Sequence, residues 1–487
     1  LGGFSTLYRG LTINTCFKKV LTSTLPSIAV LVIIAFHFYY AYNYALRVND
    51  YISDECWYVS SARNLIVKVF KGQPLYVSDD GLLGINVLVS SYLGTEGVIN
   101  EILASGRVVK RDYRNVNMIY AEVRELDIIQ RLSGMPNVIS VIPGYRYPDS
   151  SRITDYLNTE HPPLVKYFIA TSIAVCGDRP ICWRLPSIIA SCAILMIVYL
   201  IIKSVVGGTV GNYLGVVAVL ITSLDTLFRS LSIVAMLDIF TSLFTVLTLY
   251  LIVKQRVYAA VAVLGLAFIS KYTGLFALPA LTYYMFKRME PFKAILYVVC
   301  IPALMLILSS TPLISTLGFQ QWWYEAVENA VRWHLSVKTL SGPPTSAPWE
   351  WLVGLNPFIL HYEYVNGELV ADLIARGNNA IYLIATALTL LILPALRKLP
   401  DGGITLTYTW SIFMMYVFIW IIGSRTQYSF YMVQLTPLIY TSLMIQLFWI
   451  TFDKNFKELM RIWYDMLLNI IKWLRGEVRI KVRVIVE

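Results

Sequence analysis

The chain has 487 residues, of which 57% are hydrophobic and only 14% are charged, and its mean hydropathy is +0.62. This composition excludes a soluble globular domain, because a soluble core cannot bury so much apolar surface. The net charge of +10 does not indicate nucleic-acid binding, since the basic residues lie in short loops between apolar runs and form no single stripe.

The first long apolar run, residues 26–45, predicts a transmembrane helix, because about 20 apolar residues cross the hydrocarbon layer. The run has no small-residue cleavage site, so it is expected to be a retained span and not a cleaved signal. Arg9, Lys18 and Lys19 precede it. The positive-inside rule therefore places the N-terminus in the cytoplasm, and the segment 1–83 holds this span and the start of a large outer loop.

Within that loop, residues 84–148 change in character to a soluble α+β unit. The expected elements are a strand at 85–92, a helix at 95–105, a hairpin of strands at 108–113 and 117–123, a helix at 125–133 and a strand at 138–142. The order βαββαβ is that of a ferredoxin-like domain. Residues 126–143 also resemble the propeptide-type inhibitor domains of subtilisin-like proteases. A structural insert, the docking of a partner protein and capture of the acceptor remain open.

Apolar runs after this loop predict nine further spans and therefore about ten in all. They lie at 183–203, 210–228, 236–253, 257–270, 273–286, 292–310, 379–396, 404–422 and 428–450. An even number places both termini and the basic loops in the cytoplasm, and leaves 46–182 and 311–378 outside. We therefore predict an α-helical polytopic membrane protein whose transmembrane core is 149–450.

The C-terminal segment 451–487 is expected to be a cytoplasmic tail. Residues 455–474 are amphipathic, and 477–487 alternate like a strand. We expect this tail to be a surface element without catalytic meaning.

Six cysteines in 487 residues do not form a disulfide scaffold. Cys176 and Cys182 flank a short segment that is placed outside, so they are candidates for a local disulfide. Cys16, Cys192 and Cys300 are expected to be ordinary buried thiols.

Two polar clusters stand at the ends of the first outer loop. Asp54 and Glu55 follow the first span, and Glu160 and His161 precede a Pro-Pro pair near the end of the loop. Adjacent carboxylates close to a membrane are costly to desolvate, and a carboxylate can serve as a general base or hold a metal. The residues alone leave open a solvated turn at Asp54 and a helix start after His161.

These clusters and later motifs resemble the protein O-mannosyltransferase family, membrane glycosyltransferases of the GT-C class that use a polyprenyl-phosphate mannose donor. The shared motifs, in chain order, are Asp54-Glu55, His161-Pro162-Pro163-Leu164-Val165-Lys166, Ala235-Met236-Leu237-Asp238, Lys271-Tyr272-Thr273-Gly274, Trp333-His334, 345–351, Arg376-Gly377-Asn378-Asn379, and Ser424-Arg425 followed by 428–431. The resemblance covers nearly the whole chain except the insert and the tail after about residue 452. It implies a GT-C-like fold and inverting transfer of a sugar, mannose in this family, to serine or threonine hydroxyls on the outer face of a cell or ER-type membrane.

The resemblance also implies roles for single residues. Asp54 is expected to be the general base, and Glu55 to orient acceptor or sugar hydroxyls. The residues expected to bind the donor phosphate are Lys166, Lys271 and Arg425. Those expected to line the substrate pocket are Glu160, His161, Asp238, His334, Trp349, Trp351 and Asn378. The alternatives are snorkelling of the three cations to lipid head groups, a helix-start role for Asp238 and interfacial anchoring by the tryptophans.

The chain departs from the family pattern at several points. Glu160 is adjacent to His161, whereas the family usually has an acidic residue, commonly aspartate, one position further away. Ile233 stands where an arginine is common, and Arg229 lies one turn earlier. The lumenal sugar-binding trefoil of the eukaryotic members is absent. These departures leave the sugar and the acceptor open.

We expect the partners to be membrane lipids, a polyprenyl-phosphate sugar and an acceptor protein, without nucleic acid. The outer segments hold no spaced His or Cys cluster, so neither a metal nor another cofactor is expected. Two alternatives remain: a lipid or glycan glycosyltransferase of the aminoarabinose-transferase type, and a noncatalytic subunit of a membrane assembly. An open outer cavity containing Asp54 would favour an enzyme, and a filled one the structural role.

Overall fold

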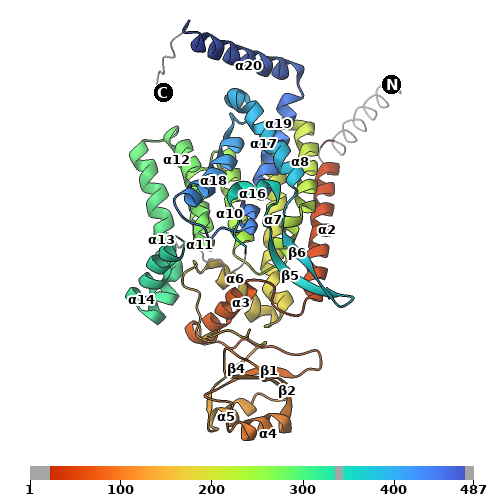
Figure 1. Cartoon of the computed structure of the whole chain (residues 1–487), viewed down its shortest axis with the longest axis vertical. Coiled ribbons are helices and arrows are strands. Elements are labelled where there is room, and N and C mark those ends of the chain that lie inside the picture. Colours follow the sequence, from red (N-terminus) through yellow and green to blue (C-terminus); the bar gives the residue numbers. More distant parts are fainter. Residues whose placement is uncertain (1–21, 23, 335–343, 478–487) are drawn as a thin grey trace, which may run out of the picture.

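The computed structural model describes residue 22, residues 24–334 and residues 344–477. It shows a body of roughly parallel helices with the α+β insert at one end and a helix lying crosswise at the other (Figure 1). The predicted fold class, an α-helical membrane protein with a small α+β insert, is confirmed.

Each of the ten predicted spans is helical in the structure. The helices of the body are α2 (Leu25–Arg47), α7 (Pro180–Val206), α8 (Gly208–Leu224), α9 (Thr226–Ser232), α10 (Asp238–Val253), α11 (Val257–Ser270), α12 (Leu278–Phe286), α13 (Pro291–Leu317), α17 (Asn379–Ile392), α18 (Ile404–Ile421) and α19 (Thr436–Ile450). The shorter helices around them are α3 (Glu55–Asn64), α6 (Leu164–Cys176), α14 (Phe319–Trp323), α15 (Ala330–His334) and α16 (Pro348–Val353).

Fewer helices are long enough to cross a membrane alone than the ten predicted. Within the described residues five are long and apolar enough, and the bent pair α8 and α9 makes a sixth. Helices α10, α11 and α19 have 16, 14 and 15 residues. At a rise of about 1.5 Å per residue they are shorter than the hydrocarbon core of about 30 Å. The predicted spans 257–270 and 273–286 are separate helices, because a 3-10 segment, Tyr272–Ala277, lies between α11 and α12.

Asp225 holds the 70° bend between α8 and α9. This buried carboxylate accepts hydrogen bonds from the backbone N–H of Phe228 and of Asn378, at 2.9 Å each. It also accepts the hydroxyls of Tyr382 and Tyr440, at 3.0 and 2.7 Å. Four donors compensate for the burial of the carboxylate and fix α17 and α19 against the bend.

The insert has the predicted order of elements, βαββαβ. Its bounds are β1 (Leu83–Val89), α4 (Glu96–Ser105), β2 (Gly106–Lys110), β3 (Met118–Val123), α5 (Ile128–Ser133) and β4 (Val138–Pro143). The four strands form one antiparallel sheet in the order β2-β3-β1-β4. Ile85, Val87, Ile119 and Ala121 pack with Ile102 and other residues of α4 and α5. On strands β1 and β3, alternate residues point to opposite faces, so Tyr120 faces away from these two helices.

A buried arginine joins the insert to the helical body. Arg63, near the end of α3, pairs with Asp178 at 2.7 Å, and both side chains are fully buried. The guanidinium lies 5.0–5.9 Å from the centres of four aromatic rings, those of Tyr51, Tyr145, Tyr147 and Trp183. Asp178 in turn accepts the backbone N–H of Tyr145 and the indole N–H of Trp183. The end of the insert, α3 and the start of α7 therefore share one cluster.

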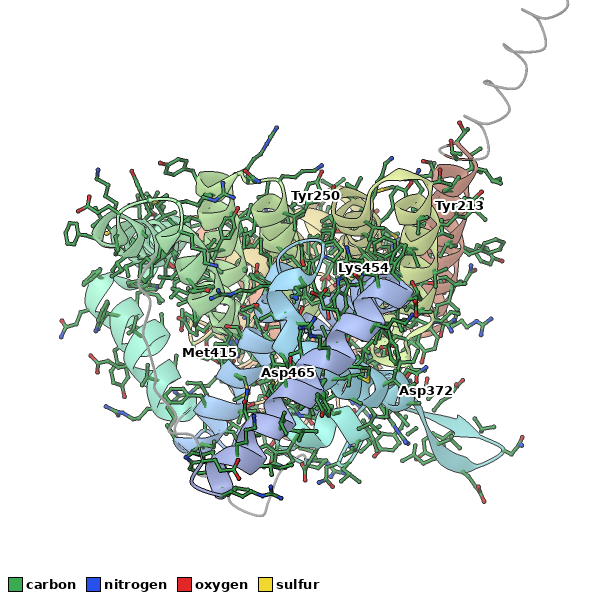
Figure 2. All side chains as sticks on the ribbon, turned by 90° about the horizontal axis from the view of Figure 1, so that it is seen from above. Tyr213, Tyr250, Asp372, Met415, Lys454 and Asp465 are labelled. Atoms are coloured by element: carbon green, nitrogen blue, oxygen red, sulfur yellow. A yellow bond between two sulfur atoms is a disulfide. The ribbon has the colours of Figure 1, made fainter. Side chains whose placement is uncertain are left out.

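A β-hairpin that the sequence reading did not identify lies in the second outer segment. Strands β5 (Phe358–Val365) and β6 (Glu368–Ala375) pair antiparallel around Asn366 and Gly367, whose φ angles are 54° and 87°. Asn-Gly is the preferred pair for such a turn, because both central residues need positive φ. The hairpin, which carries Asp372, projects sideways from the body (Figure 2).

Helix α20 (Asp453–Leu474) contains the predicted amphipathic stretch and crosses the end of the body opposite the insert (Figures 1 and 2). Leu459 is its only fully buried residue among those described, and the indole of Trp463 donates to the carbonyl of Leu391. Lys398 pairs with Glu458. The strand predicted at 477–487 lies almost entirely outside the described residues.

Cys176 and Cys182 form a disulfide with a Cα–Cα distance of 5.9 Å. The prediction of buried thiols is wrong for Cys300, which is exposed, and Cys192 is only half-buried. Cys300 lies on α13, a helix with little burial inside the protein, so lipid is its expected surrounding. Cys16 lies outside the described residues.

Candidate active site

A cavity of about 870 Å³ opens beside α3, near the insert end of the helical body. Its walls come from the start of α3, the loop before α6, the segment around α15, the start of β5 and the segment before α19. The lining residues are Asp54, Trp57, Tyr58, Tyr156, Asn158, Glu160, His161, Asn329, Ala330, Arg332, Phe358, Tyr428 and Phe430. Three predicted site residues, Asp54, Glu160 and His161, are thus brought together from positions about a hundred residues apart.

Asp54 stands at the N-terminus of α3. The turn before it is closed by a hydrogen bond from the Glu55 N–H to the carbonyl of Ile52, and Ser53 has a φ of 50°. The Asp54 carbonyl accepts the N–H groups of Trp57 and Tyr58, which begins the helix. A carboxylate at a helix N-terminus interacts favourably with the helix dipole, so this position suits the side chain of Asp54.

Glu55 has a different position from the one predicted. Its side chain is fully buried and pairs with the buried Arg184 at 2.8 Å. Its two oxygens also accept the backbone N–H groups of Ala235 and Ile52, each at 2.8 Å. Glu55 therefore does not line the cavity, and its placement is at odds with direct contact to a substrate hydroxyl.

Glu160 belongs to a hydrogen-bonded group on the cavity wall. It accepts the hydroxyl of Tyr156 and, at 3.0 Å, the side-chain amide of Asn158. Burial, followed by the charge of Glu160, raises the pKa of Tyr156 above its ordinary value. Tyr156 therefore remains a neutral hydrogen-bond donor, and the group presents fixed polar atoms to the cavity.

Lys166 lies beneath this loop and not in the cavity. The side chain is fully buried, and the ammonium donates to the carbonyls of Asn158 and His161, the latter at 2.8 Å. Its donors are directed at the backbone of the loop, which explains why it does not reach the site predicted for the donor phosphate. The ring of His161 packs edge-on against that of Tyr58, with centroids 5.9 Å apart.

Asp238 and Lys271 form a third buried ion pair, with 2.6 Å between Lys271 Nζ and Asp238 Oδ1. Asp238 is the first residue of α10, and the Lys271 ammonium lies 3.7 Å from the ring centre of Tyr431. Neither residue lines the polar cavity, although Asp54 interacts electrostatically with Lys271. The pair therefore braces one side of the site.

The remaining predicted residues lie away from the polar cavity. Arg425 is exposed and stacks 4.8 Å from the ring of Trp420, and Trp349 also packs on Trp420. Trp351 is buried, and its indole donates to Ser346. Asn378 caps the N-terminus of α17. The expected convergence of three cations on one phosphate is not seen among the described residues. His334 ends α15, but its side chain lies outside the described part of the chain.

Sequence reasoning missed Arg332 and Asn329, which are exposed and line the cavity. Their segment is held in place by a hydrogen bond from Thr159 to Glu325 and another from Tyr272 to the carbonyl of Ala326. The available signal was an arginine immediately before the Trp-His motif. Arg332 was not predicted because the family motif consists of Trp333 and His334 alone.

A second cavity, of about 390 Å³, is lined mainly by apolar side chains. It lies between α11, α13 and α18, and Ala330 lines both cavities. Tyr431 lines the apolar cavity, while the adjacent Phe430 lines the polar one. A polar and an apolar space thus meet at one wall, which suits a ligand with a polar head and an apolar tail.

The fold and this site define an integral membrane protein with a polar cavity at one end of its helices. Residues 160–314 match the model of the dolichyl-phosphate-mannose-protein mannosyltransferase family. The match confirms, over that part of the chain, the resemblance drawn from the motifs. No curated protein sequence matches the chain at a significant level.

Solved structures with some likeness to the chain include the following two. ArnT from Cupriavidus metallidurans in the apo state has a TM-score of 0.46 and 12% identity, over 86% of this chain and 60% of that one. The oligosaccharyltransferase of Archaeoglobus fulgidus in the apo form has a TM-score of 0.44 and 11% identity, over 88% of this chain and 50% of that one. The chain therefore spans less than two thirds of the length of either protein.

Proposed function

We propose that the protein is a glycosyltransferase that moves a sugar from a polyprenyl-phosphate donor to a hydroxyl acceptor. The observation that carries this proposal is the open cavity of about 870 Å³ at Asp54, which shares a wall with an apolar cavity. A noncatalytic subunit needs no such cavity. The match of residues 160–314 to the mannosyltransferase family supports mannose as the sugar and a protein serine or threonine as the acceptor.

The proposed reaction is a single displacement. Asp54 takes the proton of the acceptor hydroxyl while the hydroxyl oxygen attacks the anomeric carbon of the sugar. The bond from this carbon to the phosphate oxygen breaks, the electron pair leaves with the phosphate, and the anomeric configuration inverts. The sugar lies against Glu160 and Asn158, whose polar atoms are fixed by their mutual hydrogen bonds.

Arg332 takes the role that the sequence assigned to other cations. It lines the cavity, whereas Lys166 and Lys271 are committed to buried partners. A guanidinium can compensate the charge that develops on the departing phosphate. The prenyl chain would then enter the neighbouring apolar cavity.

We further propose that the cavity faces outward and that both ends of the chain are cytoplasmic, in line with the positive-inside rule. The proposed reaction uses no metal. Within the described ranges, no three His, Cys, Asp or Glu side chains form a group that would hold a metal ion.

The test is transfer from dolichyl-phosphate mannose to a Ser/Thr peptide by the purified full chain. Asp54→Asn removes the proposed base and is expected to lower the rate by about 100-fold or more, with an unchanged unfolding temperature. Asp155→Asn is the matched control, because Asp155 is an exposed carboxylate of the same loop that pairs with Lys68 and lies outside the cavity. Equal rates for Asp54→Asn and the control would remove Asp54 from the reaction.

A further inference from the structure

A third cavity has a volume of about 260 Å³ and is lined in part by the end of α12. Figure 1 shows α12 toward the end of the helical body that carries α20, away from α3 and the insert. The cavity is formed by the end of α12, the 3-10 segment Leu393–Lys398 and the start of α18. Its charged lining residues are Lys287, Arg288, Arg397 and Asp401. Neither the mannosyltransferase motifs nor the proposed reaction uses this cavity.

The basic groups of this cavity have no acidic partner in the described part of the chain. Among the described residues, none of Lys287, Arg288 and Arg397 takes part in an ion pair, whereas the adjacent Lys398 pairs with Glu458 of α20. The carboxylate of Asp401 is occupied by the backbone, because it accepts the N–H groups of Gly403 at 2.9 Å and of Thr405 at 2.7 Å. The lining therefore carries an excess of positive charge.

Aromatic side chains hold two of these cations at the cavity. The Lys287 ammonium lies 4.5 Å from the ring centre of Tyr283, and the Arg288 guanidinium lies 5.2 Å from that of Tyr284. Arg288 also donates to the side-chain carbonyl of Gln255 at 3.1 Å. Cations fixed in this way lose less side-chain entropy when they bind an anion than free surface lysines do.

We propose that this cavity binds a phosphate group through Lys287, Arg288 and Arg397. Three cations that line one cavity, two of them guanidinium groups with several donors each, match the charge and the acceptor oxygens of a phosphate. The ligand is either the head group of an anionic membrane lipid or a soluble phosphate compound. The amphipathic helix α20 crosses the same end of the body, where lipid head groups are the nearest source of phosphate (Figure 2).

The test measures lipid retained by the full chain in native mass spectrometry after detergent extraction from vesicles. The vesicles contain phosphatidylcholine with or without phosphatidylglycerol. Arg288→Gln with Arg397→Gln is expected to lower phosphatidylglycerol retention by about 10-fold, because each cation near an anionic lipid surface contributes appreciable binding. The matched control is Lys457→Gln with Arg461→Gln, which removes two charges from α20 at the same end, outside the cavity.

A parallel arm adds inorganic phosphate or pyrophosphate to the lipid-depleted protein and follows the unfolding temperature. A rise for the native chain and the control pair, but not for the Arg288 and Arg397 pair, supports the phosphate site and identifies a soluble ligand. Selective phosphatidylglycerol retention without such a rise supports the site and identifies a lipid. Equal loss in both pairs, or equal retention of the two lipids with no effect of phosphate, overturns the proposal. Asp54 does not line this cavity, and neither arm measures transfer. Failure of the proposed transfer reaction would therefore leave the outcome of these binding tests unchanged.

Discussion

The buried pair of Glu55 and Arg184 gives the sharpest prediction, because it separates a structural role from a catalytic one. Glu55→Gln keeps the shape of the side chain but leaves the Arg184 guanidinium buried without its counter-charge. Breaking a buried pair from one side typically costs 3–5 kcal/mol. The neutral amide can still accept the backbone N–H of Ala235 through its carbonyl oxygen, so we expect a loss at the lower end, about 3 kcal/mol, or roughly 100-fold in the folding equilibrium.

The assay is chemical unfolding in detergent, with transfer activity measured on the same samples. Glu55→Gln should lower the stability and should reduce activity only as far as α3 is displaced. Asp54→Asn should lower the transfer rate by about 100-fold or more and leave the stability unchanged. Combining Glu55→Gln with Arg184→Met removes both charges and should recover part of the lost stability. If Glu55→Gln kept native stability and lost activity as completely as Asp54→Asn, Glu55 would have to contact the substrate, and the positioning role would be refuted.

Arg332→Gln should lower the rate of transfer by about 10–100-fold at saturating donor without changing the unfolding temperature, since a transition-state charge contact is worth about 1.4–2.7 kcal/mol; an unchanged rate excludes Arg332 from phosphate stabilisation. Replacing both Cys176 and Cys182 by serine should lower the free energy of unfolding by about 2 kcal/mol, because the disulfide closes a loop of only six positions. In the native protein, alkylation of intact cells with a membrane-impermeant reagent after reduction should label the exposed Cys176 if it lies outside. Gly144→Ala should destabilise the protein by about 1–3 kcal/mol in thermal unfolding, since φ is 132° and a Cβ would lie 2.7 Å from the Asp178 carboxylate. Native stability of this variant would contradict the described contact between the end of the insert and Asp178. Transfer activity should persist in EDTA, and its loss with recovery on adding a divalent cation would show that a metal takes part.

Much of the fold was predictable because it depends on periodicity and composition. The runs of apolar residues located all ten helical segments, and alternation gave the order of elements in the insert. Span length was harder, because an apolar run such as 428–450 continues through a 3-10 segment into α19, and only the backbone shows where the helix begins. The hairpin around Asn366 and Gly367 was predictable from its Asn-Gly pair, which is the preferred turn between two short strands. It was not predicted, because only the family motifs of this region were interpreted.

The site was predictable only in part. Asp54, Glu160 and His161 line one cavity, as expected from their motifs. The motifs could not distinguish Asp54 from its neighbour Glu55, because the side that each side chain faces depends on the turn before α3. Lys166 illustrates the same limit: a lysine one turn into a helix can point to a ligand or cap the preceding loop, and only the tertiary structure decides.

The insert looks like a module that could be cut from the outer loop, but the cluster around Arg63 makes such a deletion unsafe. Tyr145 and Tyr147, which directly follow β4, supply two of the four rings around the guanidinium. Deleting the whole segment would remove two of the rings that surround Arg63 and leave the ion pair of Arg63 and Asp178 partly uncovered. It would also loosen the C-terminal end of α3, the helix that Asp54 precedes. A shortened protein for functional work should therefore keep residues 144–148 and rejoin the chain within the sheet. Loss of a binding partner can then be distinguished from displacement of α3.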